Sequence, residues 1–374
     1  MNSAKNQVNL NAFYTLVKAG LWEKNVQLFQ YNGIDFYDIL RIAEEQAVVG
    51  LVAAGINNIV DVKPHQEILL QFVGESLQLE QQNTAMNLFI GKLMEKMRVA
   101  GIYTILVKGQ GIAQCYEKPL WRACGDVDFL LSDDNYNKAK AFLSPIAISV
   151  EPENKIEKHL GLTIDSWVVE LHGTMHGYLS HKIDKVVDEA RKDVFYGGSV
   201  RSWFNGKYQV FLPSADSDVI FVFTHFLKHF YKGGLGVKQI CDWCRLLWTY
   251  KDAIKKDLLE KRIKKMGVMS EWKAFGAFAV EYLGMPSEAM PFYSDDVKWK
   301  RKADMISSFV IEVGNMGHNR ESSYYNAPYL IRKINSMGRR IGDLIRHSRI
   351  FPLDSFLFLP TILIKGIKSA AKGE

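Results

Sequence analysis

The sequence predicts an α+β fold, in which a small mixed sheet lies between a helical N-terminal region and a helical C-terminal region. Apolar residues recur three and four positions apart before residue 100 and again after residue 214, which is the period of amphipathic helices. The part in between contains short β-branched and apolar runs, which favour strands. Because 374 residues exceed one typical domain, we expect three regions, 1–100, 101–213 and 214–374.

Five short apolar runs predict the strands: 102–108, 126–131, 159–164, 166–173 and 208–213. We expect a helix between the second and third runs, where Asp133 and Asp134 stand near its N-terminus and complement the helix dipole. Ser214 is expected to cap the first helix of the C-terminal region, because its hydroxyl can accept a hydrogen bond from a free backbone N–H.

Composition places the chain among folded globular proteins, because 48% of its residues are apolar and 24% are charged. The N-terminal sequence lacks the uninterrupted apolar core of a secretion signal, and residues 351–364 are too short and too interrupted to span a bilayer. Cys241 and Cys244 form a C-x-x-C in an apolar helical run, without a second pair at zinc spacing. We therefore expect buried thiols and a cytoplasmic protein.

The net charge of +6 is concentrated near the C-terminal end. Residues 332–374 contain nine Lys and Arg against three Asp and Glu, so the rest of the chain is neutral overall. This pattern indicates either a solvated helical face or attraction to an anionic partner, such as lipid or a phosphorylated substrate. Peripheral contact of this segment with an anionic membrane is therefore one hypothesis.

Two aspartates interrupt the apolar run at 126–131. On a strand, residues two apart face the same side, so Asp126 and Asp128 project together while Val127 and Phe129 face the other way. Two carboxylates held this close repel each other unless a cation neutralises them. Their hard oxygen atoms suit Mg²⁺. Two aspartates at this spacing are common on strands, however, and do not establish a metal site by themselves.

Glu170 offers a third carboxylate on a later predicted strand. It could complete a metal cluster with Asp126 and Asp128, act as a general base on an acceptor hydroxyl, or face solvent at a sheet edge. Three acidic groups around two Mg²⁺ ions suit nucleotidyl transfer. One ion lowers the pKa of the attacking hydroxyl, and the other stabilises the departing pyrophosphate.

A turn with two glycines precedes the aspartates. The first predicted strand runs into Gly109 and Gly111, where backbone N–H groups can approach phosphate oxygens at the start of a short helix. Lys108 and Arg122 could add positive charge against a triphosphate. Tight strand-to-helix turns also use glycine for steric reasons alone.

The order of these motifs resembles the uncharacterised nucleotidyltransferase family of bacteria, a branch of the DNA polymerase beta-like nucleotidyltransferase superfamily. The resemblance covers roughly residues 100–250. It is carried by Lys108-Gly109, Tyr116, Arg122, Gly125-Asp126-Val127-Asp128, Glu170-Leu171-His172, and by His225, His229, Gly236 and Asp242 in the run "THFLKHFYKGGLGVKQICDW". Lys238 stands where the family tends to carry arginine, so a cation remains but the bidentate guanidinium is lost.

The resemblance implies an enzyme with a small nucleotidyltransferase-type sheet, which moves a nucleoside monophosphate from a nucleoside triphosphate, with ATP as the first candidate, to an unknown hydroxyl or phosphate acceptor. It also implies two Mg²⁺ ions held by Asp126, Asp128 and Glu170. The residues expected to contact the nucleotide are Lys108, Gly109, Gln110, Arg122 and Gly125.

The helical second half is expected to shape the acceptor pocket. His225 and His229 lie four residues apart on one helix face, but the sequence between them lacks the glutamate of a zinc-protease helix. They could instead pack beneath the site or contact substrate. His172 should face the same side as Glu170. Lys238 and Asp242 are further candidates for acceptor binding, although their spacing also suits an ion pair on a helix surface.

Two alternatives stay open at the level of sequence. The chain could be a catalytically inactive nucleotide- or RNA-binding protein with the same fold, although all three carboxylates are present. It could also modify an RNA terminus, as relatives in the superfamily do. Nucleic acid is not the favoured partner, because the Lys and Arg residues of this chain are not interleaved with aromatic residues on a predicted sheet face.

Overall fold

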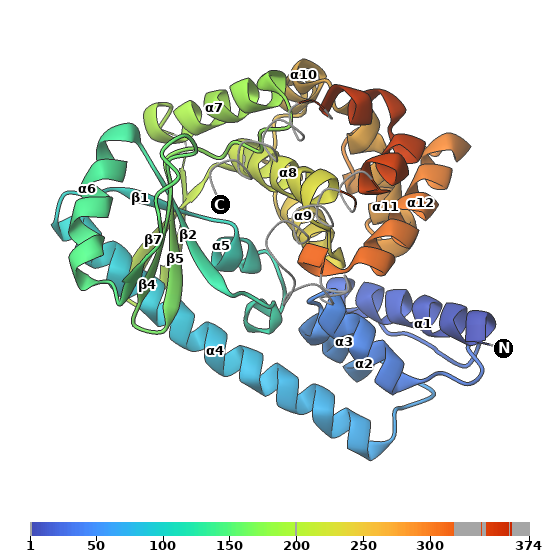
Figure 1. Ribbon diagram of the computed structural model, residues 1–374. Helices are drawn as coiled ribbons and strands as arrows, with labels where there is room; N and C mark the ends of the chain where they lie inside the picture. The colour runs from blue at the N-terminus through green and yellow to red at the C-terminus, as the bar shows by residue number, and fades with distance from the viewer. Residues whose placement is uncertain (1, 199, 318–337, 339–341, 359, 361–374) are drawn as a thin grey trace.

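The computed structural model describes residues 2–198, 200–317, 338, 342–358 and 360. It confirms the predicted α+β class: a five-stranded mixed sheet and a two-stranded hairpin are accompanied by many helices. Figure 1 shows the sheet on one side of the molecule and the helices of the C-terminal region on the other, with the N-terminal helices below them.

The N-terminal region is helical, as predicted. It consists of α1 (Asn2–Trp22), α2 (Phe36–Glu45), α3 (Val49–Asn57) and α4 (Gln66–Val99). Helix α4 is 34 residues long and runs from the N-terminal helices to the sheet, where it packs against the hairpin (Figure 1). Helices α1 and α3 approach each other closely at two glycines. A Cβ atom on Gly20 would lie 1.9 Å from the Leu51 carbonyl oxygen.

The main sheet has the strand order β1-β2-β5-β4-β3. Strands β2 and β5 are parallel, and the other neighbouring pairs are antiparallel. The strands are β1 (Thr104–Val107), β2 (Asp126–Leu131), β3 (Ser149–Val150), β4 (His159–Ile164) and β5 (Trp167–His172). The predicted strands at 126–131 and 159–164 have the bounds of β2 and β4, because apolar runs with clear ends mark both.

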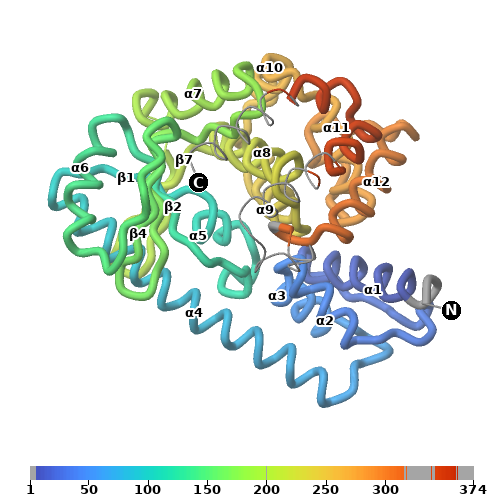
Figure 2. Tube along the Cα trace, viewed as in Figure 1, coloured from blue at the N-terminus to red at the C-terminus, as the bar shows by residue number. Residues whose placement is uncertain are grey.

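Short elements connect and cover the sheet. Helix α5 (Gly109–Ala113) follows β1 and lies between the sheet and α9, as the chain path in Figure 2 shows. Helix α6 (Asp133–Leu143) is the one predicted after β2 and begins with Asp133 and Asp134. The remaining elements of this region are η1 (Pro119–Trp121), η2 (Ser144–Ile146), α7 (His181–Tyr196), β6 (Val200–Asn205) and β7 (Tyr208–Pro213).

The last predicted strand is β7, but it pairs with β6 in a separate hairpin and does not extend the main sheet. Strand β6 was not expected from the sequence. Its apolar side chains Val200 and Phe204 are exposed, so the strand lacks the buried apolar run by which the others are found.

The C-terminal region is helical, as predicted. Its described elements are α8 (Ala215–Lys232), α9 (Val237–Thr249), α10 (Lys256–Met266), α11 (Met269–Leu283), η3 (Ser287–Ala289), α12 (Val297–Val313) and η4 (Asn315–Gly317). Ser214 occupies the N-cap position of α8. Its side chain bonds to the Ser217 hydroxyl (Oγ–Oγ 3.2 Å) and does not accept from a backbone N–H.

Two hydrophobic clusters form the core. The larger one is shared by the N-terminal helices and the C-terminal helices and contains the buried indoles of Trp243 and Trp272. The smaller one lies between α4, α6, the hairpin and one face of the sheet, and it receives Val127 and Phe129 from β2. The opposite face of β2 carries Asp126 and Asp128, followed by Leu130, which packs into the larger cluster.

All four cysteines are free and buried, which confirms the prediction of buried thiols and gives the C-x-x-C no partner for zinc among the described residues. Within the part of the chain that the structure describes, no helix combines the length and the apolar character needed to cross a membrane. Of the basic segment 332–374, residues 338, 342–358 and 360 are described. The rest of that segment lies outside the described residues, and its membrane contact stays a prediction.

Candidate active site

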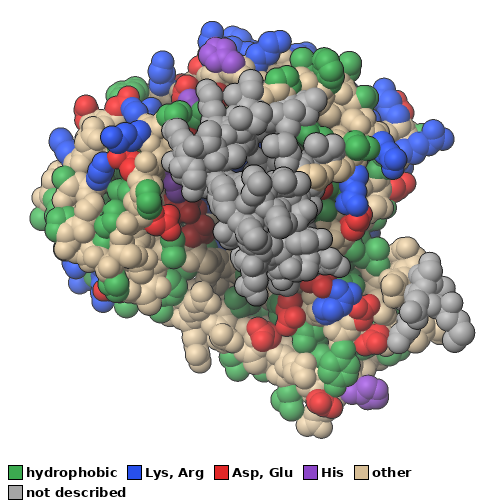
Figure 3. All heavy atoms as spheres, in the orientation of Figure 1, with side chains coloured by type: hydrophobic (Ala, Val, Ile, Leu, Met, Phe, Trp, Pro, Cys, Tyr) green, Lys and Arg blue, Asp and Glu red, His purple; other side chains and the backbone are tan. Residues whose placement is uncertain are grey.

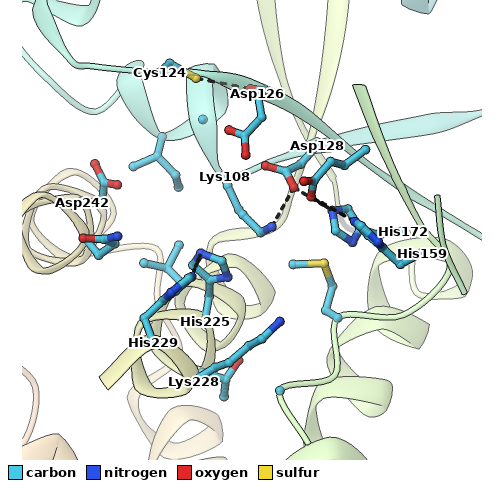
Figure 4. A pocket seen from close by; sticks show the side chains of 18 of the residues that line it. Lys108, Cys124, Asp126, Asp128, His159, His172, His225, Lys228, His229 and Asp242 are labelled. Carbon is cyan, nitrogen blue, oxygen red and sulfur yellow. Dashed lines mark hydrogen bonds and ion pairs between the residues drawn. The ribbon is translucent and has the colours of Figure 1, made fainter. Parts of the chain in front are cut away.

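A cavity of about 340 Å³ opens between the sheet and helices α8 and α9. Its sheet side is formed by carboxylates and histidines from β2, β4 and β5. Its helix side is formed by His225, Lys228 and His229 from α8 and by Lys238 and Asp242 from α9 (Figure 4). The described Lys and Arg side chains are interspersed with Asp and Glu on the face of the molecule seen in Figure 3.

Three carboxylates meet in this cavity. Strands β2 and β5 run parallel, and their register places Asp128 directly opposite Glu170. Asp126 lies two residues earlier on the same face of β2. One oxygen atom from each of Asp126, Asp128 and Glu170 lies within 4.8 Å of the other two. The structure therefore brings together, on one side of the sheet, the three acidic residues that the sequence singled out.

Asp128 is buried, and two basic groups contact it. The Lys108 amine donates to Asp128 Oδ1 (Nζ–Oδ1 2.7 Å), and His172 Nε2 lies 2.6 Å from the same oxygen atom. Burial alone would raise the pKa of Asp128, but the charges of Lys108 and His172 hold it below its usual value. The Asp128 carboxylate likewise outweighs burial at Lys108 and raises the pKa of its amine.

The other two carboxylates differ in their electrostatic surroundings. Desolvation in the cavity and the charge of Asp128 raise the pKa of Asp126. Hydrogen bonds from His159 and His172 strongly lower the pKa of Glu170. Both of these histidines place Nε2 3.2 Å from Glu170 Oε2. Of the three carboxylates, Asp126 is thus the one whose negative charge is least compensated by neighbouring groups.

The turn after β1 directs Lys108 into the cavity. Lys108 has φ 55° and ψ −145°, a region that residues other than glycine rarely adopt, and Gly109 follows with φ 35°. Such backbone costs on the order of 1–3 kcal/mol and is often found at functional sites. A Cβ atom on Gly109 would lie 3.1 Å from Cys124 Sγ, so this turn also has little room for a side chain.

Gln110 and Gly125, two of the residues predicted to contact nucleotide, do not line the cavity. The Gln110 side chain is fully buried and donates to Asn83 Oδ1 (2.5 Å). Asn83 in turn donates to the backbone carbonyls of Leu120 and Arg122. The side chain of Gln110 therefore supports the loop before β2. Gly125 is exposed and directly precedes Asp126.

Arg122 lines the cavity, but its guanidinium group is bound to Asp242. Arg122 Nε and Nη2 each lie 2.7 Å from one carboxylate oxygen of Asp242, and the Tyr116 hydroxyl donates to the same carboxylate at 2.8 Å. Asp242 therefore pairs with Arg122, and not with Lys238 as the helix spacing would allow. The Lys238 amine makes a long contact with the Ala123 carbonyl (3.4 Å), and burial lowers its pKa.

His225 and His229 face each other at the helix side of the cavity, with 3.1 Å between their Nε2 atoms (Figure 4). Burial and the nearby lysine charges lower the pKa of His229 to about 4 and that of His225 well below its usual value. Both imidazoles are therefore neutral near pH 7. Among the described residues, no third His, Cys, Asp or Glu completes a metal group with this pair.

The sequence did not point to His159 or Lys228 as site residues. His159 is the first residue of β4, and it reaches the site because it lies opposite His172 on β5. Cross-strand register is not readable from one strand alone. Lys228 lies one turn after His225 on α8, so the helical period could have placed it on the cavity face.

The fold and the site together define an α+β protein with a candidate acidic metal-binding group on neighbouring strands of a mixed sheet. A sequence model of the family described as uncharacterised nucleotidyltransferase matches residues 32–284, which is more than half of the chain and includes the three carboxylates and the histidines and lysines around them. The chain belongs to that family, as the order of its motifs predicted, and family membership makes it a transferase with a nucleotide substrate. No curated protein and no solved structure matches the chain significantly.

Proposed function

We propose that the protein is a metal-dependent nucleotidyltransferase, which transfers a nucleoside monophosphate from a triphosphate, with ATP as the first candidate, to a hydroxyl or phosphate acceptor. The observation that carries this proposal is the convergence of Asp126, Asp128 and Glu170 on one cavity. Three carboxylate oxygens form a hard, anionic donor set, which fits Mg²⁺. When bound, Mg²⁺ would activate the attacking hydroxyl and stabilise the departing pyrophosphate.

Residues on the sheet side of the cavity fall into two roles under this proposal. The strongly lowered pKa of Glu170 makes it a poor general base and favours a role as a metal ligand. Lys108, on its flexible stem, neutralises Asp128 and remains close enough to the cavity to bind a phosphate oxygen. Gly109 lines the same wall and offers its backbone to the triphosphate.

The helix side of the cavity suits the acceptor. The neutral imidazoles of His225 and His229 can donate or accept hydrogen bonds, and the buried amine of Lys238 adds positive charge. Arg122 and Asp242 neutralise each other, so we assign them to shaping this wall. A hydroxyl-bearing or phosphorylated acceptor is compatible with these groups.

The test is a co-crystal of the protein with a non-hydrolysable triphosphate and Mg²⁺, combined with a pyrophosphate-release assay. We expect metal density beside all three carboxylates, and we expect Asp126→Asn and Asp128→Asn each to abolish turnover while leaving the circular dichroism spectrum unchanged. Turnover at the wild-type rate in either variant, or a triphosphate bound away from the cavity, would sink the proposal.

A second candidate is a nucleotide-binding protein without turnover. One observation favours it: Lys108 and His172 already contact Asp128, so side chains of the protein itself partly replace a metal. Calorimetry separates the two candidates. Mg²⁺-dependent binding of ATP, without pyrophosphate release in the presence of hydroxyl or phosphate acceptors, would support the binding protein.

A further inference from the structure

Two histidines and one carboxylate form a second group beside the three carboxylates. His159 on β4 lies directly opposite His172 on β5, and their rings are 4.9 Å apart between centroids. Glu170 lies two residues before His172 and therefore faces the same side of the sheet. Single donor atoms of His159, Glu170 and His172 all lie within 4.8 Å of one another, and all three residues line the cavity.

The distances within this group resemble those between the ligands of one ion. Glu170 Oε2 is 3.2 Å from Nε2 of His159 and 3.2 Å from Nε2 of His172. A tetrahedral ion with bonds of 2.0–2.1 Å places neighbouring donor atoms about 3.3 Å apart. A hydrogen bond between a charged imidazole and a carboxylate is shorter, about 2.7–2.9 Å. The spacing of the three donor atoms is therefore close to that of ligands around one ion. To act as a ligand, His172 Nε2 must exchange its contact with Asp128 Oδ1 (2.6 Å) for the ion.

The ligand atoms of His159, Glu170 and His172 differ chemically from those of the neighbouring group of three carboxylates. Imidazole nitrogen suits Zn²⁺, Co²⁺ and related transition metals, whereas carboxylate oxygen alone suits Mg²⁺. His159 and Glu170 are about one third exposed at their side chains, so an ion can reach them from the cavity. Glu170 belongs to both groups.

We infer that His159, Glu170 and His172 form a binding site for a first-row transition-metal ion, adjacent to the carboxylate group and sharing Glu170 with it. The cavity then offers two cation positions of different selectivity. The catalytic meaning of this site rests on the proposed function, but binding of the ion itself does not.

A rival position for the same ion is the pair His225 and His229. These two histidines lie on the helix side of the same cavity, and they lack a third ligand among the described residues. A test must therefore distinguish the two pairs of histidines. His229→Gln is the matched control, because it removes one imidazole from the cavity and leaves the sheet side unchanged.

The experiment uses the full chain without a histidine tag, stripped of metal by a chelator. Co²⁺ is titrated in, and its visible absorption reports binding and the geometry of its ligands. We expect one equivalent of Co²⁺ to bind with an absorption typical of imidazole and carboxylate ligands. His159→Gln and His172→Gln should each weaken binding by about 100-fold or more, since even changes around a metal's ligands cost 10–100-fold. His229→Gln should leave the titration unchanged.

Three outcomes decide the inference. It is overturned if the wild-type chain gives no such absorption, if His159→Gln binds Co²⁺ as the wild type does, or if His229→Gln is the variant that loses binding. Mg²⁺-supported turnover is measured in parallel on the wild type. Turnover without Co²⁺ binding at the sheet side would overturn this inference alone, whereas Co²⁺ binding without turnover would overturn only the proposed function. Circular dichroism checks that each variant is folded.

Discussion

Arg122 and Asp242 form a buried, bidentate ion pair across 120 residues of sequence. Their side chains are 6% and 8% exposed, and the Tyr116 hydroxyl donates a further hydrogen bond to the same carboxylate. Arg122 stands in the loop that leads into β2, and Asp242 stands on α9. The pair therefore holds the loop before β2 against the helix side of the cavity.

The first prediction concerns the stability contributed by this pair. Asp242→Asn should lower the free energy of unfolding by about 3–5 kcal/mol, because it leaves a buried guanidinium without its counter-charge. Urea denaturation at pH 7 measures the change. Arg41→Ala is the control. Arg41 pairs with Asp38 and Glu45 at the surface, where its side chain is 56% exposed, so the loss should be at most about 1 kcal/mol. Equal losses in the two variants would contradict the assignment.

The second prediction contrasts the two aspartates of β2. Asp128→Asn should destabilise the fold by roughly 3 kcal/mol, because Lys108 and His172 lose a buried partner. Asp126→Asn should leave stability unchanged or raise it, because it removes the desolvated charge and the repulsion from Asp128, which together raise the pKa of Asp126. Urea denaturation at pH 7 measures both, in the absence of divalent metal.

The two aspartates should also make stability depend on pH in opposite directions. The lowered pKa of Asp128 means that its contribution is present above the unfolded pKa and is lost as the pH falls through the folded value. The raised pKa of Asp126 means that stability is lost as the pH rises through its folded value. Destabilisation by Asp126→Asn as large as that by Asp128→Asn would contradict the electrostatic account.

The sequence predicted those features of the fold that are encoded locally. The bounds of β2 and β4, the helix after β2 and the common face of Asp126 and Asp128 all follow from apolar runs and the alternation of a strand. Glu170 was predicted as the third carboxylate from its motif and from its position on a later strand. The structure places it opposite Asp128.

Features that depend on pairing between distant segments were not predictable in the same way. No local pattern indicates that Arg122 meets Asp242, or that His159 reaches Glu170 from a neighbouring strand. The side chain of Gln110 could equally have faced the cavity, because a turn of two glycines does not fix the direction of the residue between them. Such contacts depend on register and on tertiary packing, which local pattern does not specify.

The third prediction concerns the contact between α1 and α3. A Cβ atom on Gly20 would lie 1.9 Å from the Leu51 carbonyl oxygen, and one on Gly55 would lie 2.1 Å from the Leu16 carbonyl oxygen. Gly20→Ala and Gly55→Ala should each destabilise the protein by about 1–3 kcal/mol or more, because the helices must separate. Thermal denaturation measures the shift.

A third glycine provides the matched control for this contact. Gly74 lies in helix α4, and a Cβ atom added to it meets nothing within 4 Å. Gly74→Ala should therefore stabilise the protein by up to about 1 kcal/mol, through helix propensity alone. If all three substitutions had the same effect, close packing of α1 on α3 would not be the reason for the glycines.

The fourth prediction is a pH dependence that arises away from the cavity. Glu271 is fully buried in α11, where the Tyr231 hydroxyl donates to its carboxylate (3.0 Å). Burial, together with the nearby charge of Asp354, raises the pKa of Glu271 to about 8. Because the folded state binds this proton more tightly than the unfolded chain, the contribution to stability is full below the unfolded pKa of about 4.3 and is lost as the pH rises to about 8.

Glu271→Gln should remove this dependence, since glutamine stays neutral at every pH. Wild-type protein should lose a few kcal/mol of unfolding free energy between about pH 4.5 and pH 8, at up to about 1.4 kcal/mol per pH unit, and the variant should lose less. Urea denaturation across this range measures both slopes. Tyr231→Phe is the companion variant: it removes a hydrogen bond that favours the carboxylate, so the loss of stability should extend to higher pH. Parallel pH profiles for wild type and Glu271→Gln would show that Glu271 is not protonated in the folded protein.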